Sequence, residues 1–179
     1  MITIISCTHR PNSASLKVAQ WIQKEIHSQG MKAEMWDLQS LPPHFLFSEM
    51  FGKRTPEMEL DITKFIEQSK QLIWVVPEYN GSFSGITKIL LDAVAPSLWL
   101  NKWCYLVGVS SGAAGNLRGQ EHLTGIMHYL KMHVHYHKPK LSAIEHSLDL
   151  AQGEITGRNA DQLQMMIRLV QQDQLQFPV

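Results

Sequence analysis

The sequence has few cysteines, no long apolar run and no excess of either charge. Its 179 residues contain only Cys7 and Cys104, which are too few for a disulfide framework and lack the paired spacing of a zinc site. No stretch approaches the roughly 20 apolar residues of a membrane-spanning helix, and the N-terminal residues lack the pattern of a signal peptide. We therefore expect a cytoplasmic protein with no membrane partner.

The balance of charges excludes a further class of function. Lys and Arg together number 16, as do Asp and Glu, whereas a nucleic-acid-binding protein usually has a basic excess. We therefore expect no nucleic-acid partner. A hydrophobic fraction of 44% and a charged fraction of 18% are typical of a globular protein. No repeat, low-complexity tract or linker divides the chain, and we expect a single domain over residues 1–179.

Apolar runs and helical periodicities alternate along the chain. Apolar runs predict strands at 2–6, 32–36, 72–76, 104–109 and 134–141. Apolar positions spaced three and four apart, together with start signals, predict helices at about 16–26, 56–66, 85–98, 118–130 and 161–174. Strands that alternate with helices form a parallel sheet covered on both faces. The predicted fold class is therefore α/β: a three-layer, doubly wound sheet of five parallel strands in the order 2-1-3-4-5.

The first of three polar loops on one edge of this sheet has the chemistry of a phosphate site. It follows the first predicted strand, precedes a helix, and carries Thr8, Arg10, Ser13 and Ser15. A helix N-terminus offers unpaired N–H groups, which suit a phosphate when hydroxyls and a guanidinium lie beside them. The same residues are equally consistent with a Ser13 that only caps the helix and an Arg10 that is only solvated.

The other two loops follow the third and fourth predicted strands and are expected at the same edge, where ligands bind in this architecture. Tyr79 could pack beside a flat heteroaromatic ligand, and the backbone amides around Asn80 and Gly81 could bind its polar edge. The small residues of the 110–116 loop would permit a close approach to a ring. Each loop taken alone is also consistent with an ordinary connection between a strand and a helix.

Residues 77–82, Pro-Glu-Tyr-Asn-Gly-Ser, follow an apolar strand and resemble the PEYNGS signature of the NADPH-dependent FMN reductase family, which includes quinone, azo-dye and chromate reductases. The first loop resembles the family's GSxRxxS phosphate loop, and the third resembles its small-residue turn. The order and spacing agree from about residue 2 to 172. The resemblance implies a flavodoxin-like fold with the following FMN contacts: Thr8, Arg10, Ser13 and Ser15 at the phosphate; Pro77, Glu78, Tyr79, Asn80 and Gly81 along the isoalloxazine; and Ser110, Ser111 and Gly112 at its other edge.

The resemblance also implies a function and an assembly. It implies a reductase that passes electrons from NADPH or NADH through FMN to a quinone-like or other small acceptor, as a homodimer or homotetramer. We expect no catalytic side chain, because the cofactor supplies the redox chemistry. Two departures from the family pattern are Cys7, in place of the first glycine of the phosphate loop, and the aliphatic residues 89–91. A flavin-binding electron carrier without enzymatic turnover, and a flavodoxin-like interaction module that has lost FMN, therefore remain as alternatives.

Two further patterns have ordinary structural interpretations. His133, His135 and His137 alternate on a predicted strand, but no fourth ligand is evident, and we predict no metal site. Trp99 and Trp103 belong to an apolar stretch that is either core or an oligomer contact.

Overall fold

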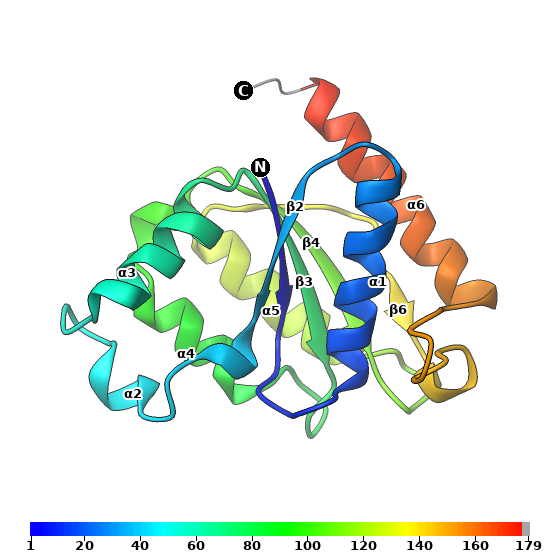
Figure 1. Ribbon diagram of the computed structural model, residues 1–179, viewed down its shortest axis with the longest axis horizontal. Helices are drawn as coiled ribbons and strands as arrows, with labels where there is room; N and C mark the ends of the chain where they lie inside the picture. Colours follow the sequence, from blue (N-terminus) through cyan, green and yellow to red (C-terminus); the bar gives the residue numbers. More distant parts are fainter. Residues whose placement is uncertain (177–179) are drawn as a thin grey trace.

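A parallel β-sheet runs through the middle of the computed structural model, which describes residues 1–176 (Figure 1). The strands are β1 (Ile2–Ser6), β2 (Ala33–Asp37), β3 (Gln71–Pro77), β4 (Trp103–Val109), β5 (His133–Val134) and β6 (Lys140–Leu141). Their order is β2-β1-β3-β4-β5, and β6 pairs with β4. The predicted doubly wound order is confirmed.

The fifth strand differs from the single strand predicted at 134–141. β5 pairs with the beginning of β4 and β6 pairs with its end, so the sheet has six strands rather than the predicted five. Between the two, the His135 ring stacks on Tyr105, with 5.4 Å between ring centroids. Pro139 has no N–H to donate to a ladder, and only its carbonyl bonds to β4, at the Gly108 N–H (2.9 Å). Residues 135–139 are therefore not part of a strand, although the His135 N–H still donates to the Cys104 carbonyl of β4 (2.9 Å).

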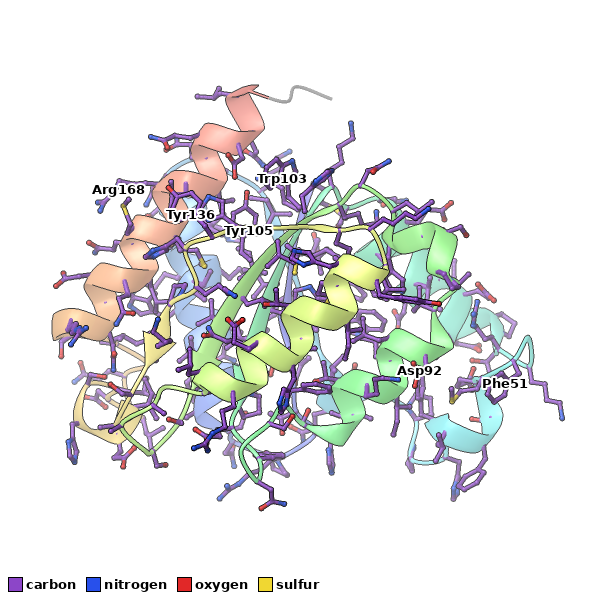
Figure 2. The ribbon with its side chains drawn as sticks, turned by 180° about the vertical axis from the view of Figure 1, so that it is seen from behind. Phe51, Asp92, Trp103, Tyr105, Tyr136 and Arg168 are labelled. Carbon is purple, nitrogen blue, oxygen red and sulfur yellow. The ribbon has the colours of Figure 1, made fainter. Side chains whose placement is uncertain are left out.

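Helices cover both faces of the sheet. They are α1 (Ala14–Ser28), α2 (Phe45–Ser48), α3 (Pro56–Ile62), α4 (Gly85–Ala93), α5 (Leu117–Tyr129) and α6 (Gly157–Gln176). α1 and α6 lie on one face, in front of the sheet in Figure 1, and α4 and α5 lie in front of it in the reverse view of Figure 2. No helix within residues 1–176 is long and apolar enough to cross a membrane.

β3 shows why the central strands are apolar on both sides. Ile73 and Val75 pack into the core shared with α1 and α6, whereas Trp74 and Val76 pack into the core on the opposite face. A strand covered on both faces has no polar side, which explains the continuous apolar run in the sequence. Trp99 is fully buried against Trp74. This part of the apolar stretch that contains Trp99 and Trp103 is therefore core and not an oligomer contact.

Helix ends follow local chemistry. α3 begins as predicted, with the Thr55 side chain accepting a hydrogen bond from the Met58 N–H (3.3 Å) and proline at the first helical position. α4 ends at Ala93 rather than at residue 98, because Val94 and Ala95 are extended ahead of Pro96. α6 begins four residues earlier than predicted.

Candidate functional site

Four loops surround a cleft at the carboxyl ends of the strands, along the lower edge of the sheet in Figure 1. The cleft has a volume of about 540 Å³. Its lining residues are Arg10, Pro11, Asn12, Ser13, Ala14, Ser15, Pro77, Glu78, Tyr79, Val109, Ser110, Ser111, Ile144, Glu145, Leu148 and Leu150. Eight of the twelve predicted site residues are among them. Thr8, Asn80, Gly81 and Gly112 are not.

The first loop presents hydrogen-bond donors to the cleft. Ser13 is the N-cap of α1 and accepts a hydrogen bond from the Leu16 N–H (3.1 Å). The N–H groups of Ala14 and Ser15 therefore belong to the first turn, where no intrahelical acceptor is available. Within residues 1–176, neither the Ser15 hydroxyl nor the exposed Arg10 guanidinium has a hydrogen-bond or ion-pair partner. This end of the cleft therefore suits an anion.

Thr8 lies behind the first loop rather than on the cleft surface. The residue is fully buried, and its hydroxyl oxygen accepts a hydrogen bond from the Arg10 N–H (3.1 Å). The same hydroxyl lies 2.7 Å from the Tyr79 hydroxyl. Thr8 thus joins the first loop to the second, across 71 positions of sequence.

Cys7 also points away from the cleft. Its side chain is fully buried among the apolar residues under α4, and burial raises the pKa of the thiol far above its ordinary value. The Cys7 carbonyl accepts hydrogen bonds from the hydroxyls of Ser84 (2.5 Å) and Thr87 (3.3 Å). The cysteine that replaces the expected glycine therefore fills core space, and a thiol held in its protonated form is a poor nucleophile.

The second loop is a tight hairpin. Tyr79 and Ser82 exchange two backbone hydrogen bonds (2.9 and 3.1 Å) around Asn80 and Gly81, whose φ angles are +52° and +75°. Positive φ at both central positions is the geometry that an Asn-Gly pair favours. The turn projects Asn80 and Gly81 beyond the cleft lining. Their N–H groups have no acceptor among the described residues.

Backbone hydrogen bonds join the remaining loops. The Glu78 N–H donates to the Val109 carbonyl (2.9 Å), which ties the second loop to the end of β4. The Ser110 N–H donates to the Leu141 carbonyl (3.1 Å), and the Ser110 hydroxyl donates to the Gly112 carbonyl (2.9 Å). The cleft therefore has a framework that is already hydrogen-bonded.

Gly115 allows the third loop to lie against β6. A Cβ at this position would lie 2.6 Å from the carbonyl carbon of Lys140, and its φ is +56°. Both the close approach and the backbone conformation require glycine. The glycine in this small-residue loop thus brings the third loop against the next strand.

The fourth side of the cleft was not predicted from the sequence. It is formed by Ile144, Glu145, Leu148 and Leu150, which follow β6. A topological signal was available, because the loop after the fifth strand position emerges at the same edge as the other three. Its mixed composition gave no chemical signal.

The alternating histidines have separate environments. The His135 ring contacts Tyr105 and Tyr136, two residues that Figure 2 shows beside α6, and burial lowers the pKa of His135. His137 Nε2 lies 3.1 Å from the Gln162 carbonyl. Across residues 1–176 no three His, Cys, Asp or Glu side chains are grouped so that they could hold a metal ion.

Comparison with known proteins identifies relatives. The family model described as "NADPH-dependent FMN reductase" matches residues 1–141. The chain is 36% identical over 98 residues to a 2-hydroxy-1,4-benzoquinone reductase of a Burkholderia species, covering 52% of each protein. It is 32% identical over 124 residues to an NAD(P)H:quinone oxidoreductase of Solanum tuberosum, covering 68% of this chain and 62% of that protein. The chain therefore spans about half to three-fifths of the length of these relatives.

The fold has a similar solved structure. A flavoenzyme NAD(P)H:(acceptor) oxidoreductase from Paracoccus denitrificans matches with a TM-score of 0.77 and 20% identity. The match covers 94% of this chain and 93% of that protein. At this level of identity the likeness shows a common fold.

Proposed function

This chain belongs to the NADPH-dependent FMN reductase family, and from that premise we propose that it binds FMN in the cleft and reduces a quinone-like or other small acceptor with electrons from NADPH or NADH. The observation that carries the proposal is the group of unpartnered donors at the N-terminus of α1, which faces a cleft bounded by four loops.

The phosphate end of the cleft fits its proposed ligand. Arg10 and Ser15 have donors without partners among the described residues, and the first-turn amides of α1 lie beside them. We assign the phosphate to Arg10, Ser13, Ser15 and these amides. Thr8, the remaining residue of the predicted phosphate set, lies behind this loop and accepts a hydrogen bond from the Arg10 N–H. The cleft volume of about 540 Å³ is within the range of small-molecule and cofactor sites, about 300–1,000 Å³.

The ring end of the cleft uses the second and third loops. We assign Pro77, Glu78 and Tyr79 to one side of the isoalloxazine and Ser110 and Ser111 to the other. Asn80, Gly81 and Gly112 do not line the cleft, so their proposed contribution is made by the backbone amides and the bend of each loop. The hydrogen bonds among the loops fix these positions before a ligand arrives, which reduces the entropy lost on binding.

The chain's own residues bind and orient rather than react. When bound, FMN would supply the two-electron chemistry of the reaction. The protein provides a cation and helix amides at the phosphate, apolar walls beside the ring, and an opening through which nicotinamide and acceptor can enter. Cys7 takes no part as a nucleophile, since its thiol is buried and its pKa is raised.

We also propose that residues 1–179 act as one flavodoxin-like FMN-binding domain, in the cytoplasm, as a homodimer or homotetramer. Residues 177–179 of that range lie outside the described residues. The surface beside α4 and α5 supports the assembly, because Phe51 and Tyr129 on it are 89% and 85% exposed. Figure 2 shows Phe51 beside Asp92 of α4.

An absorption spectrum tests the function. The purified protein is mixed with FMN, desalted, and then treated anaerobically with NADPH. We expect a retained flavin band that bleaches on reduction and returns when a quinone is added. A retained band that NADPH does not bleach would instead indicate an electron carrier, and a colourless protein would indicate a module that has lost FMN.

A further inference from the structure

One wall of the cleft lies outside the region that the family model matches. The match ends at residue 141, whereas Ile144, Glu145, Leu148 and Leu150 all come later in the chain. We refer to residues 142–156 as the outer segment. It is seen at the lower right of Figure 1, between α1 and the beginning of α6. The family match therefore does not describe the chemistry of this wall, which has to be read from this chain's own residues.

The outer segment is internally ordered. The Leu148 N–H donates to the Ile144 carbonyl (2.9 Å), and the Thr156 N–H donates to the Ser147 carbonyl (2.9 Å). The Asp149 N–H donates to the Glu154 carbonyl (2.9 Å). Such backbone bonds across a turn hold a loop in one conformation, so its side chains keep fixed positions at the cleft.

The outer segment is also fixed to the elements around it. The Ile144 N–H donates to the Ser110 carbonyl (3.2 Å) of the third loop. The Asn159 side chain of α6 donates to the Ser142 carbonyl (3.1 Å) and to the Ser147 hydroxyl (2.7 Å). Ile144 and Leu148 are only 4% and 6% exposed, because they pack into the core under α1 and α6. The wall is therefore part of the folded framework rather than a mobile flap.

The charges on the cleft surface are unequal. Arg10 is the one cationic side chain among the lining residues, and the proposed function pairs it with a phosphate. Two carboxylates remain: Glu145 on the outer segment and Glu78 on the second loop. Within residues 1–176 neither of them forms an ion pair or a side-chain hydrogen bond, since the five ion pairs of this part of the chain involve other residues. A second molecule entering the cleft therefore meets uncompensated negative charge beside the apolar side chains of Leu148 and Leu150.

We infer that the outer segment selects the electron acceptor by charge, with Glu145 disfavouring anionic acceptors relative to uncharged planar ones such as unsubstituted quinones. This inference rests on the proposed function. An apolar ring can contact the leucines of the wall, whereas a sulfonate or carboxylate is repelled by Glu145. A like charge several ångströms away near a protein surface should change the reaction rate about three- to tenfold.

The test compares two acceptors that share one ring and differ in charge, 1,4-benzoquinone and its monosulfonate; their differences in size and reduction potential cancel when the rate ratio is compared between protein variants. The FMN-loaded protein is reduced anaerobically with dithionite, excess reductant is removed, and reoxidation by each quinone is followed by stopped-flow absorbance at low ionic strength. In this half-reaction the quinone gains two electrons and two protons and leaves as the hydroquinone, while the protein-bound flavin returns to its oxidised form. No nicotinamide is present, so its own negative charge does not enter the measurement.

Three variants separate the wall from general charge effects. Glu145→Gln should lower the ratio of the benzoquinone rate to the sulfonate rate about three- to tenfold, and Glu145→Lys should lower it further. Glu57→Gln, an exposed carboxylate in the first turn of α3 and outside the cleft lining, is the matched control and should leave the ratio unchanged. The difference between wild type and Glu145→Gln should shrink at 0.5 M salt, since exposed charges are screened.

The outcomes distinguish the inference from the function on which it rests. A protein that takes up FMN and is reoxidised by both quinones, with a ratio that Glu145→Gln and Glu145→Lys leave unchanged, would overturn the inference alone. The inference alone would also be overturned if Glu57→Gln lowered the rate ratio as much as Glu145→Gln, because that result would show an effect of overall charge. A protein that does not take up FMN would overturn both.

Discussion

The hydrogen bond between Thr8 and Tyr79 can be removed from either side with little change in shape. Thr8→Val replaces the hydroxyl with a methyl group of similar size, and Tyr79→Phe removes only the phenolic hydroxyl. The two oxygens are 2.7 Å apart, and the Thr8 oxygen also accepts from the Arg10 N–H at 3.1 Å. Thr8→Val therefore removes two hydrogen bonds at a fully buried position, whereas Tyr79→Phe removes one.

The magnitudes follow from this count. A net contribution of about 0.5–1.5 kcal/mol for each bond predicts a loss of about 1–3 kcal/mol in the free energy of unfolding for Thr8→Val. The same value predicts about 0.5–1.5 kcal/mol for Tyr79→Phe. Because the two changes remove a shared bond, the double variant should lose less than the sum of the single variants, by about 0.5–1.5 kcal/mol. Urea unfolding of the four proteins measures this coupling, and Thr8→Ser, which keeps the hydroxyl and loses a buried methyl group, should retain the coupling to Tyr79.

Ligand binding shows how the bond acts on the site. Because the Thr8 hydroxyl bonds both to the Arg10 N–H of the phosphate loop and to Tyr79 beside the ring, a supporting role predicts that Thr8→Val weakens the binding of riboflavin, which lacks only the phosphate, as well as that of FMN. If the Thr8 hydroxyl instead contacts the phosphate, FMN binding alone should weaken. Fluorescence titration with both flavins makes the comparison. Selective loss of FMN affinity, or strictly additive unfolding energies, would refute the supporting role that the geometry gives to Thr8.

Three other predictions concern the phosphate site, the third loop and the buried histidine. Arg10→Ala should weaken FMN binding by about 1.5–3 kcal/mol, the scale of a charge-assisted contact, and leave riboflavin binding unchanged in the same titration; an unchanged FMN affinity would contradict the phosphate assignment. Gly115→Ala should destabilise the fold to urea by about 1–3 kcal/mol, since its Cβ would lie 2.6 Å from the Lys140 carbonyl carbon, whereas Gly125→Ala on α5, with open space around it, should not. Because burial lowers the pKa of His135 below its unfolded value, its contribution to stability is present above about pH 6.5 and is lost as the pH falls through the folded pKa. The urea midpoint should therefore fall less between pH 7.5 and 5.5 in His135→Phe than in wild type, and an equal fall in both would contradict this.

The sheet and the family were predictable because their signals are local. β3 is an apolar run since both of its faces are covered, and α3 begins where Thr55 and Pro56 specify a helix start. The convergence of the three loops follows from parallel topology alone. The Pro-Glu-Tyr-Asn-Gly-Ser segment forms a hairpin whose two central residues, Asn80 and Gly81, have positive φ angles, and an Asn-Gly pair adopts such angles readily. These features require no knowledge of distant contacts.

The rest depends on residues that are far apart in sequence. The interruption of the fifth strand between Val134 and Lys140 is not revealed by the residue pattern of 134–141. The position of Thr8 depends on Tyr79, 71 residues away, so a phosphate-loop motif could not show that its hydroxyl is already engaged. The outer segment was missed because Glu145 and Leu150 have no motif around them, although the topology brings the loop after the fifth strand position to the same edge.

The interruption between β5 and β6 also affects how copies of the protein could associate. A long, regular strand at the border of a sheet offers a row of free N–H and C=O groups to which another chain can add. Here the border beside β4 consists of two strands of two residues each, separated by a segment that contains Pro139. Such a border is a poor template for a continuous sheet across two molecules. Growth of the sheet from this side is therefore disfavoured, which leaves the helices that cover its two faces as the larger surfaces for association.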